Sequence, residues 1–498
     1  MPASPLDRRD AHLTSVPLLL TLLALWLLAT LGVRPLLLPD EGRYAEVARA
    51  MRLGDALVPT LDGLPFFHKP PLFYWLDLFA MRLVGIGEFA GRFGSALGAW
   101  LMGAALLLAM RRWHGPRAAA IALGVLATTP FFFVGGQYAN HDMLVGGLIT
   151  AAVLAWARAV DAPPRVERRW MLAGWALCAL ALLAKGLIGV VLPMLVVGPW
   201  LLAQGRWRQV LKLLHPAGLI VFAVLGLPWL VAMQLRFPGF FDYFIVEQHF
   251  RRFALATFNN VHGAWFFLAV MPLATLPWSA WLPAALRRAW GARSPTLGLY
   301  AWWTIAIVGF FSIPSSKLVG YALPALAPWC ALLALAVAAG GGRAWRWAMG
   351  AAALGCVVLV GVAAVKAPNS NRELARALAA AMAPGDRVVM VDEYYYDVPF
   401  YARLAQPVRI ASDWADPEIA RRDNWRKEVA DAARFDPTLA AELLQPLAAL
   451  DRQACGASAA WFIVPAGQAA RIAALPGATR AFAGARTELW RQPGRTCH

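Results

Sequence analysis

Charged residues are scarce in this sequence, and acidic residues are the scarcer kind. Only 15% of the 498 residues are charged, whereas 60% are hydrophobic. So little charge combined with long apolar runs is typical of a polytopic membrane protein and excludes an ordinary soluble enzyme. Basic residues outnumber acidic ones by 46 to 29, a formal net charge of +17. In a membrane protein this excess sets topology and attracts anionic lipids, so we do not expect nucleic-acid binding.

Cysteine is also rare, and no signature of a metal finger or a phosphate loop is present. The five cysteines form no Cys-x-x-Cys pair and no Cys/His ligand spacing. Cys178, Cys330 and Cys356 lie in apolar runs, where we expect small buried hydrophobic side chains. Cys455 and Cys497 lie in the polar tail, and we predict a disulfide between them in an oxidising compartment.

The chain does contain many apolar segments long enough to cross a bilayer. Their number predicts about 11–13 transmembrane helices. The segments that we delimit cover about residues 13–33, 93–110, 118–135, 143–160, 171–184, 187–203, 216–235, 263–286, 297–314, 319–338 and 347–365. The first segment lacks a cleavage site of small residues, so we expect a retained helix rather than a signal peptide.

The loops between these segments differ in charge from one side to the other. Short Arg-rich loops all fall on the side of the N-terminus, at 111–117, 158–170, 204–212, 287–293 and 343–346. The positive-inside rule makes that side cytoplasmic. The long first loop (about 34–91), the loop at 236–262 and the tail fall on the other side. We therefore expect a membrane domain of residues 1–366 and an extracytoplasmic domain of residues 367–498.

The tail changes in character and predicts a small α/β domain. The segment NRELARALAAAMA has helical periodicity. DRVVMVDE, PVRI, AAWFIVPA and TELWRQ have the composition of short strands. About 130 residues are enough for such a domain to bury a core of its own.

The first loop opens with two acids, Asp40 and Glu41, followed by Arg43 and Tyr44 in an amphipathic helical pattern from about residue 41 to 53. Charges this dense beside a bilayer are costly without a purpose. We expect this helix to lie over the bilayer. Asp40 has two interpretations. It either satisfies free amides at the helix start, or it orients or deprotonates an acceptor at the membrane surface.

Two cations of this loop, Arg43 and Lys69, suit the binding of a phosphate. Arginine offers a planar fork of donors and lysine a point charge. The alternative for each is a side chain that extends toward lipid head groups. The context FFHKPPLFYW favours function for Lys69, because two prolines fix the backbone and aromatic residues flank the cation.

Further polar residues are predicted on the same side of the membrane. Asp142 begins the fourth helix and is either a helix cap or a second functional acid. Lys317 and Tyr321 lie at the outer start of the tenth helix. A lysine at that position opposes the helix dipole and indicates an anionic partner.

Histidines gather in the outer loops. EQHFRRF contains Glu247, His249 and Arg252, and its alternative interpretation is an interfacial helix. A divalent metal such as zinc needs several ligands that converge, which spacing alone does not show. His68, His249 and Glu247 are candidate ligands, and the sequence leaves open whether any cofactor is bound.

Together these stretches resemble the membrane glycosyltransferases of the GT-C type. The resemblance is closest to the aminoarabinose transferases that modify lipid A, with protein O-mannosyltransferases more distant. The matching segments are PDEGRYAEVARAM, GLPFFHKPPLFYW, NHD, LLAKG, EQHFRRF and FFSIPSSKLVGYALPALAPW. The resemblance implies a mainly α GT-C membrane fold with a C-terminal extracytoplasmic α/β domain.

The resemblance also implies roles for individual residues. Asp40 matches the family's essential acid, and Asp142 matches a second acid. Arg43 and Lys69 match residues near the lipid phosphate, and His249 falls where some relatives hold a metal. At the partner position, where those relatives carry an acid, this chain has His68. The remaining substrate-binding candidates are Tyr44, Arg252, Lys317 and Tyr321.

The function implied is inverting transfer of a sugar from a polyprenyl-phosphate donor to a lipid A-like or other envelope acceptor. The reaction would take place at the outer face of the cytoplasmic (inner) membrane, and the protein would act as a monomer. One alternative is a transporter or flippase of lipid-linked sugars, although the charges cluster in loops rather than at the membrane midplane. Others are a protein O-glycosyltransferase of the same fold and a non-catalytic scaffold.

Overall fold

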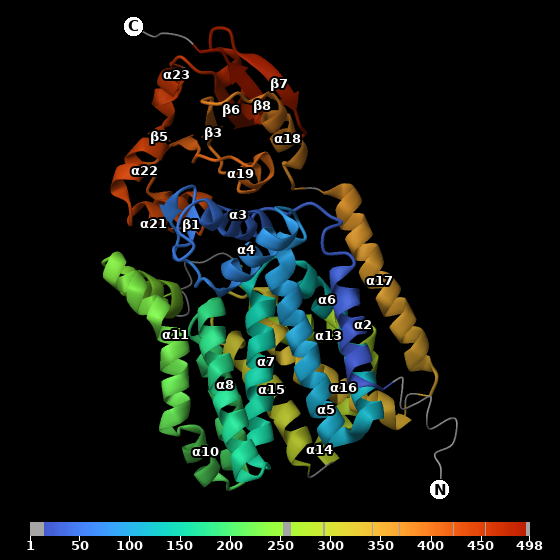
Figure 1. Ribbon diagram of the computed structural model, residues 1–498. Helices are drawn as coiled ribbons and strands as arrows, with labels where there is room; N and C mark the ends of the chain where they lie inside the picture. The colour runs from blue at the N-terminus through green and yellow to red at the C-terminus, as the bar shows by residue number, and fades with distance from the viewer. Residues whose placement is uncertain are drawn as a thin grey trace.

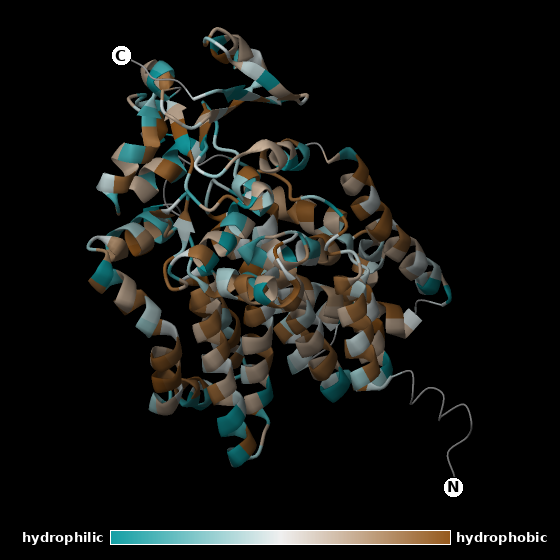
Figure 2. Ribbon diagram, turned by 45° about the horizontal axis from the view of Figure 1, so that its top comes forward, coloured by the Kyte–Doolittle hydropathy of each residue, from teal (hydrophilic) through white to brown (hydrophobic). Residues whose placement is uncertain are grey.

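The computed structural model describes residues 14–251, 260–291, 294–340, 342–367, 369–421, 423–453 and 455–494. A bundle of helices forms one end of the molecule and an α/β domain the other, with the first loop between them (Figure 1). Hydrophobic residues dominate the bundle, and hydrophilic residues gather at its lower tips and in the α/β domain (Figure 2). This separation is the pattern of a membrane domain that carries an extramembrane domain.

The bundle consists of helices α2, α5 to α11 and α13 to α17. Their bounds are α2 Val16–Leu28, α5 Phe93–Ala127, α6 Pro130–Gln137, α7 His141–Val160, α8 Pro164–Lys185, α9 Ile188–Ala203, α10 Trp207–Leu213, α11 Pro216–Arg236, α13 Phe266–Ala274, α14 Leu282–Gly291, α15 Pro295–Ser312, α16 Leu326–Gly340 and α17 Ala344–Lys366. Among the described residues, six helices are long and apolar enough to span a membrane, or seven with one bent pair. Two more, α2 and α9, are apolar but shorter.

Helix α5 contains the reversal that the sequence places at 111–117. Gly115 has a non-helical backbone, with φ 86° and ψ 169°, a conformation that only glycine adopts readily. A Cβ atom on Gly103 would lie 3.2 Å from Leu123, so the two halves of the element pack side by side. The predicted segment 93–110 is therefore confirmed, whereas the segment predicted at 118–135 is divided between the end of α5 at Ala127 and the separate helix α6 from Pro130.

The predicted helix at 263–286 is also interrupted. The segment 263–286 does not form one straight span but a broken one, in which α13 and the segment from Trp278 are bent by 107°. Pro272 lies within α13, and Pro277 begins the short 3-10 helix Trp278–Trp281. Proline lacks the amide hydrogen that would continue a helix, and hydropathy alone does not register that break.

The first loop forms a compact layer between the bundle and the α/β domain. It contains α3 (Asp40–Leu53), the hairpin β1 (Thr60–Leu61) and β2 (Leu64–Pro65), α4 (Leu72–Val84) and η1 (Ala90–Arg92). The predicted helix at 41–53 is confirmed, but it does not lie open on the bilayer, because most of its residues are buried. Ion pairs such as that of Arg49 Nε with Glu46, at 2.7 Å, let its charged residues be buried.

The tail folds into an α/β domain with one mixed sheet. Its strands are β3 Arg387–Val391, β4 Arg409–Ser412, β5 Leu444–Pro446, β6 Ala460–Pro465, β7 Thr479–Ala483 and β8 Thr487–Gln492. The sheet has six strands in the order β5-β4-β3-β6-β8-β7. The pairs from β5 to β6 are parallel, whereas β8 pairs antiparallel with β6 and with β7. The four predicted strands are confirmed, and β5 and β7 escaped prediction.

Helices of this domain flank the sheet and carry its contacts with the first loop. The longer ones are α18 Arg372–Ala381, α19 Asp397–Ala402, α21 Trp425–Ala433 and α22 Pro437–Leu443, and α18 is the predicted tail helix. Tyr401 accepts a hydrogen bond from the amide of Leu36 at 2.7 Å. The amide of Val408 donates to Asp62 at 2.8 Å. These bonds join the domain to the start of the first loop and to the turn of its β1–β2 hairpin.

Candidate active site

Glu41 fixes the start of α3 against the bundle. Its buried carboxylate accepts hydrogen bonds from Arg92 Nε at 2.8 Å, Arg34 Nη2 at 2.9 Å and the amide of Ala139 at 3.0 Å. Burial alone would raise the pKa of Glu41, but the charges of Arg92 and Arg34 outweigh it and lower that pKa to about 2. Glu41 is therefore an ionised structural anchor that sets the position of its neighbour Asp40.

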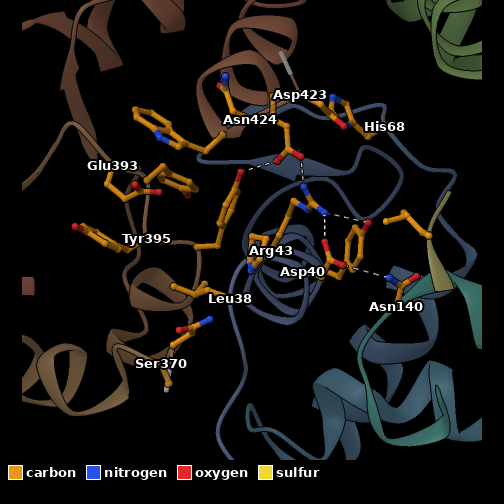
Figure 3. Close-up of a pocket in the computed structure, with 18 of the residues that line it drawn as sticks. Leu38, Asp40, Arg43, His68, Asn140, Ser370, Glu393, Tyr395, Asp423 and Asn424 are labelled. Atoms are coloured by element: carbon orange, nitrogen blue, oxygen red, sulfur yellow. Dashed lines mark hydrogen bonds and ion pairs between the residues drawn. The ribbon is translucent and has the colours of Figure 1, made fainter. Parts of the chain in front are cut away.

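Asp40 faces a cavity of about 1190 Å³ between the bundle, the first loop and the α/β domain. It is the first residue of α3, and its side chain is 31% exposed. Its carboxylate forms an ion pair with Arg43 and accepts a hydrogen bond from the Asn140 amide at 3.4 Å (Figure 3). Asp40 and Arg43, three positions apart, therefore lie on one face of α3, and one side of Asp40 remains open to the cavity.

Arg43 links the first loop to the α/β domain. In addition to Asp40, its guanidinium forms an ion pair with Glu428 of α21, 385 positions away in the sequence. Glu428 also accepts a hydrogen bond from the Tyr396 hydroxyl at 2.6 Å, and Tyr44 accepts one from Arg43 at 3.2 Å. Arg43 thus lies between two carboxylates and is held in one orientation.

Asp142 reaches the same cavity from the bundle. The Asn140 side chain caps α7 by accepting from the amide of Asp142 at 3.0 Å. The cap interpretation of Asp142 is therefore wrong, and its carboxylate instead forms an ion pair with Lys185 at the end of α8. The Lys185 ammonium also lies 4.8 Å from the centre of the Tyr321 ring, a cation–π arrangement.

Lys69 and His68 line the cavity as well. The Lys69 ammonium is half-buried and donates to the backbone carbonyl of His68 at 2.9 Å. The His68 ring stacks on Phe66 with 4.4 Å between the ring centres and lies 4.0 Å from the Asp431 carboxylate. The loop thus folds back and brings Lys69 to the cavity that Asp40 faces.

The three candidate metal ligands do not form a group in the structure, although His68 and His249 both line the cavity. Both ring nitrogens of His249 form hydrogen bonds within the protein. Nδ1 donates to the Phe244 carbonyl at 2.6 Å, and Nε2 accepts from the amide of Leu187 at 3.2 Å. Glu247 pairs with Arg434 at 3.3 Å. Within the described ranges, no three His, Cys, Asp or Glu residues are grouped to hold a metal ion. His68, His249 and Glu247 as arranged therefore do not fit a metal site, and we base no step on one.

Three other candidates have different outcomes. Tyr321 lines the cavity, whereas Lys317 is buried and donates to the carbonyl of His262 at 2.8 Å, tying two outer loops together. Arg252 lies outside the described residues.

Cys455 takes part in a disulfide bond, and Cys497, its predicted partner, also lies outside the described residues. Three cysteines, Cys178, Cys330 and Cys356, are buried free thiols as predicted.

Sequence reasoning missed the whole contribution of the α/β domain to this cavity. Glu428 forms an ion pair with Arg43, and Tyr396 donates a hydrogen bond to Glu428. Glu393, Tyr395 and Asn424 line the cavity on the side of the α/β domain (Figure 3). One signal was available. The stretch DEYYYD directly follows a predicted strand, and the end of a parallel strand is where α/β domains place functional residues.

Fold and site together define a multi-pass membrane protein that holds paired charges in a cavity beneath an extramembrane domain. Residues 68–231 match the family model described as dolichyl-phosphate-mannose-protein mannosyltransferase. A relative from Aeromonas salmonicida, an undecaprenyl phosphate-alpha-4-amino-4-deoxy-L-arabinose arabinosyl transferase, is 35% identical over 72% of this chain and 68% of its own. The chain belongs to the family of these aminoarabinose transferases, which is of the GT-C type.

Other comparisons agree on the fold. A transferase of the same name, numbered 2, from Sodalis glossinidius is 36% identical over 66% of this chain, which spans 60% of that relative's length. The crystal structure of ArnT from Cupriavidus metallidurans bound to undecaprenyl phosphate superimposes with a TM-score of 0.85 at 24% identity, covering 96% of this chain and 98% of that one. The predicted fold class, a GT-C membrane domain with a C-terminal α/β domain, is confirmed.

Proposed function

We propose that this protein transfers a sugar from a polyprenyl-phosphate donor to an envelope acceptor at the membrane surface. The observation that carries the proposal is the meeting of Asp40, Arg43, Lys69 and Asp142 at one cavity. These residues come from distant parts of the chain, yet they converge where the bundle meets the extramembrane layer. Membership of the aminoarabinose transferase family supports this reaction class.

The cations of the cavity suit the phosphate of the donor. Arg43 and Lys185 form ion pairs with carboxylates at the cavity, and the half-buried ammonium of Lys69 lies at the cavity wall. As the bond between the anomeric carbon and the phosphate oxygen breaks, the departing polyprenyl phosphate gains negative charge. A fixed cation beside that oxygen stabilises the transition state more than the bound donor. We assign this role to Lys69, with Arg43 and Lys185 as neighbours.

Asp40 is placed to act on the acceptor. An acceptor hydroxyl has a high pKa and needs a base as its oxygen attacks the anomeric carbon, and the proton would pass to the Asp40 carboxylate. An acceptor phosphate would need only orientation by the same residue. Direct attack opposite the departing phosphate inverts the anomeric configuration and forms no covalent enzyme intermediate. Arg43 holds Asp40 in place during this step.

The acceptor that we favour is a lipid A-like amphiphile, because the site lies beside the membrane and the sequence resembles the transferases that modify lipid A. A protein acceptor is the second candidate, because the matching family model describes a protein mannosyltransferase. We also propose that the protein works as a monomer, with no nucleic-acid partner.

Transfer by the purified protein tests the proposal. Detergent-solubilised protein would be incubated with undecaprenyl-phosphate aminoarabinose and lipid A, and the masses of the products would be measured by mass spectrometry. We expect lipid A to gain the mass of one sugar residue. Sugar found only on added envelope protein would favour the second acceptor. Movement of the donor across proteoliposomes without any transfer would favour a flippase and contradict the proposal.

The orientation is a separate part of the proposal. We propose that the Arg-rich loops face the cytoplasm and that the cavity and the α/β domain face the exterior of the inner membrane. A cysteine at Arg165 should resist an impermeant thiol reagent in intact spheroplasts, whereas one at Asn371 should react. Reversed labelling would place the active site on the cytoplasmic side.

A further inference from the structure

The sheet of the α/β domain has a topological switch point at the cavity. Strands β3, β4 and β5 follow one another outward, and the chain then returns to place β6 on the other side of β3. In open parallel sheets, ligands bind in the crevice beyond the carboxyl ends of the strands at this reversal. Here β3 ends at Val391 and β6 at Pro465. The residues that follow β3, from Glu393 to Tyr396, and Pro465 itself line the cavity.

The wall of the cavity at this switch point differs chemically from the wall around Asp40. Tyr395, Asn424 and Trp425 combine flat aromatic surface with an amide and a hydroxyl. In Figure 3, Glu393 and Tyr395 lie on one side of Arg43 and Asn140 on the other. Aromatic faces with a few convergent polar groups are the composition of a site for a small polar ligand, and ring faces with carboxylate and amide groups suit the alternating C–H and hydroxyl surfaces of a saccharide.

Glu393 indicates that this wall accepts a ligand. Its side chain is half-buried, and it forms no ion pair or hydrogen bond with any described residue. Burial raises the pKa of Glu393 to about 7. A partly buried carboxyl group without a protein partner is costly unless something satisfies it. Hydroxyl groups of a bound saccharide would donate hydrogen bonds to it.

We propose that the switch-point wall, formed by Glu393, Tyr395, Asn424 and Trp425, is the binding site for the saccharide head group of the acceptor. The proposal rests on the proposed transferase function and extends it. The donor lipid enters from the membrane, and its phosphate meets Lys69 at the bundle side of the cavity. The α/β domain side is therefore left for the acceptor, whose head group reaches Asp40 from above.

Glu393→Ala tests this assignment when the kinetics of donor and acceptor are measured separately. Loss of hydrogen bonds to a carboxylate should raise the KM for lipid A about 10–100-fold. The KM for the donor and the kcat at saturating lipid A should change by less than about threefold, since Glu393 lies away from the reacting atoms. Glu442→Gln is the matched control, because Glu442 is an exposed residue of the same domain outside the cavity.

Direct binding separates this proposal from the proposed function. The probe is the water-soluble saccharide released from lipid A by complete deacylation, and its binding to wild type, Tyr395→Phe and Glu393→Gln is measured by calorimetry. Binding that weakens in both variants supports the site, even if the wild type transfers no sugar and the proposed function falls. If the wild type is active and Glu393→Ala has the same KM for lipid A as Glu442→Gln, the proposed site is overturned and the proposed function stands. Absence of both transfer and saccharide binding overturns both.

Discussion

The two walls of the cavity are built in opposite ways. On the membrane side, Asp40 pairs with Arg43 and Asp142 with Lys185, so that charge is dense but balanced in pairs. On the α/β side, aromatic and amide groups lie beside charged ones such as Glu428, and Glu393 has no ion-pair partner among the described residues. A wall next to lipid must neutralise its charges to keep them there. A wall next to water can leave a polar group for its ligand to satisfy.

Within the membrane-side wall, the adjacent acids Asp40 and Glu41 show how burial divides roles. Glu41 is fully buried and receives hydrogen bonds from two arginines and two backbone amides. Asp40 keeps an open side toward the cavity. Consecutive residues on a helix point in directions about 100° apart. One acid therefore anchors the helix while the other is exposed to the cavity.

The largest expected effect is the loss of turnover in Asp40→Asn. The amide cannot accept a proton but keeps the shape of the side chain, so the fold and donor binding should persist. General-base contributions predict a fall in transfer rate of roughly 10²–10⁴-fold. Transfer kinetics and the thermal midpoint would be compared with those of Asp161→Asn on the opposite face. Full activity in a well-folded Asp40→Asn protein would leave Asp40 as a helix-start residue only.

Glu41→Ala should show the reverse pattern, with loss of stability first. Removing the carboxylate leaves Arg34 and Arg92 buried without their counter-ion, which costs about 3–5 kcal/mol. Thermal unfolding in detergent should show a marked drop in midpoint, and Glu41→Gln a smaller one. A stable Glu41→Ala protein that has lost only turnover would reverse the division of roles between the two acids.

Lys69→Met should weaken binding of the donor. The substitution keeps the apolar stem and removes the charge, so we expect about tenfold weaker binding of undecaprenyl phosphate together with slower transfer. Lys212→Met on α10 is the control, because Lys212 lies at the opposite end of the bundle and pairs with Glu167. Unchanged affinity for undecaprenyl phosphate would remove Lys69 from the phosphate site.

The smallest effect concerns the contact between the first loop and the α/β domain and depends on pH. Burial, with a smaller contribution from Glu46, raises the pKa of Asp62 from 3.8 to about 8 despite the hydrogen bond from Val408. The folded state therefore holds a proton that the unfolded state has lost, and stability falls as pH rises from about 4 to about 8. Asp62→Asn should raise the thermal midpoint by about 1–3 °C at pH 8.5 and leave it unchanged near pH 4. If wild type and Asp62→Asn have equal thermal midpoints at pH 8.5 as well as near pH 4, Asp62 does not titrate in this range.

The membrane-side wall was largely predictable from sequence because its residues lie in short segments with strong local signals. Asp40 and Arg43 are three positions apart on one helix, and Lys69 is fixed by the prolines that follow it. Hydropathy located the spans but not the bend at Pro277, because a break in the backbone leaves the average hydropathy unchanged.

The other wall was not predictable, because it depends on contacts across hundreds of residues. The strands before and after DEYYYD could be expected from composition, yet nothing in their pattern indicates which loop the domain covers. The partners of Arg43 and Asp62 in the α/β domain lie 385 and 346 positions away. The candidate metal ligands form no group among the described residues for a related reason. The spacing of the histidines did not reveal that His249 accepts a hydrogen bond from the amide of Leu187, 62 positions away.

The bond between Arg43 and Glu428 makes the order of synthesis matter. Arg43 leaves the ribosome early, whereas Glu428 is made only after the last helix of the bundle has been completed and the chain has continued into the α/β domain. A newly inserted protein therefore holds Asp40 and Lys69 at the membrane surface before the roof of the cavity exists. Catalytic competence would arise as a single late event, when the terminal domain closes over the loop. A protein cut after Lys366 would keep the whole membrane bundle but lose that roof.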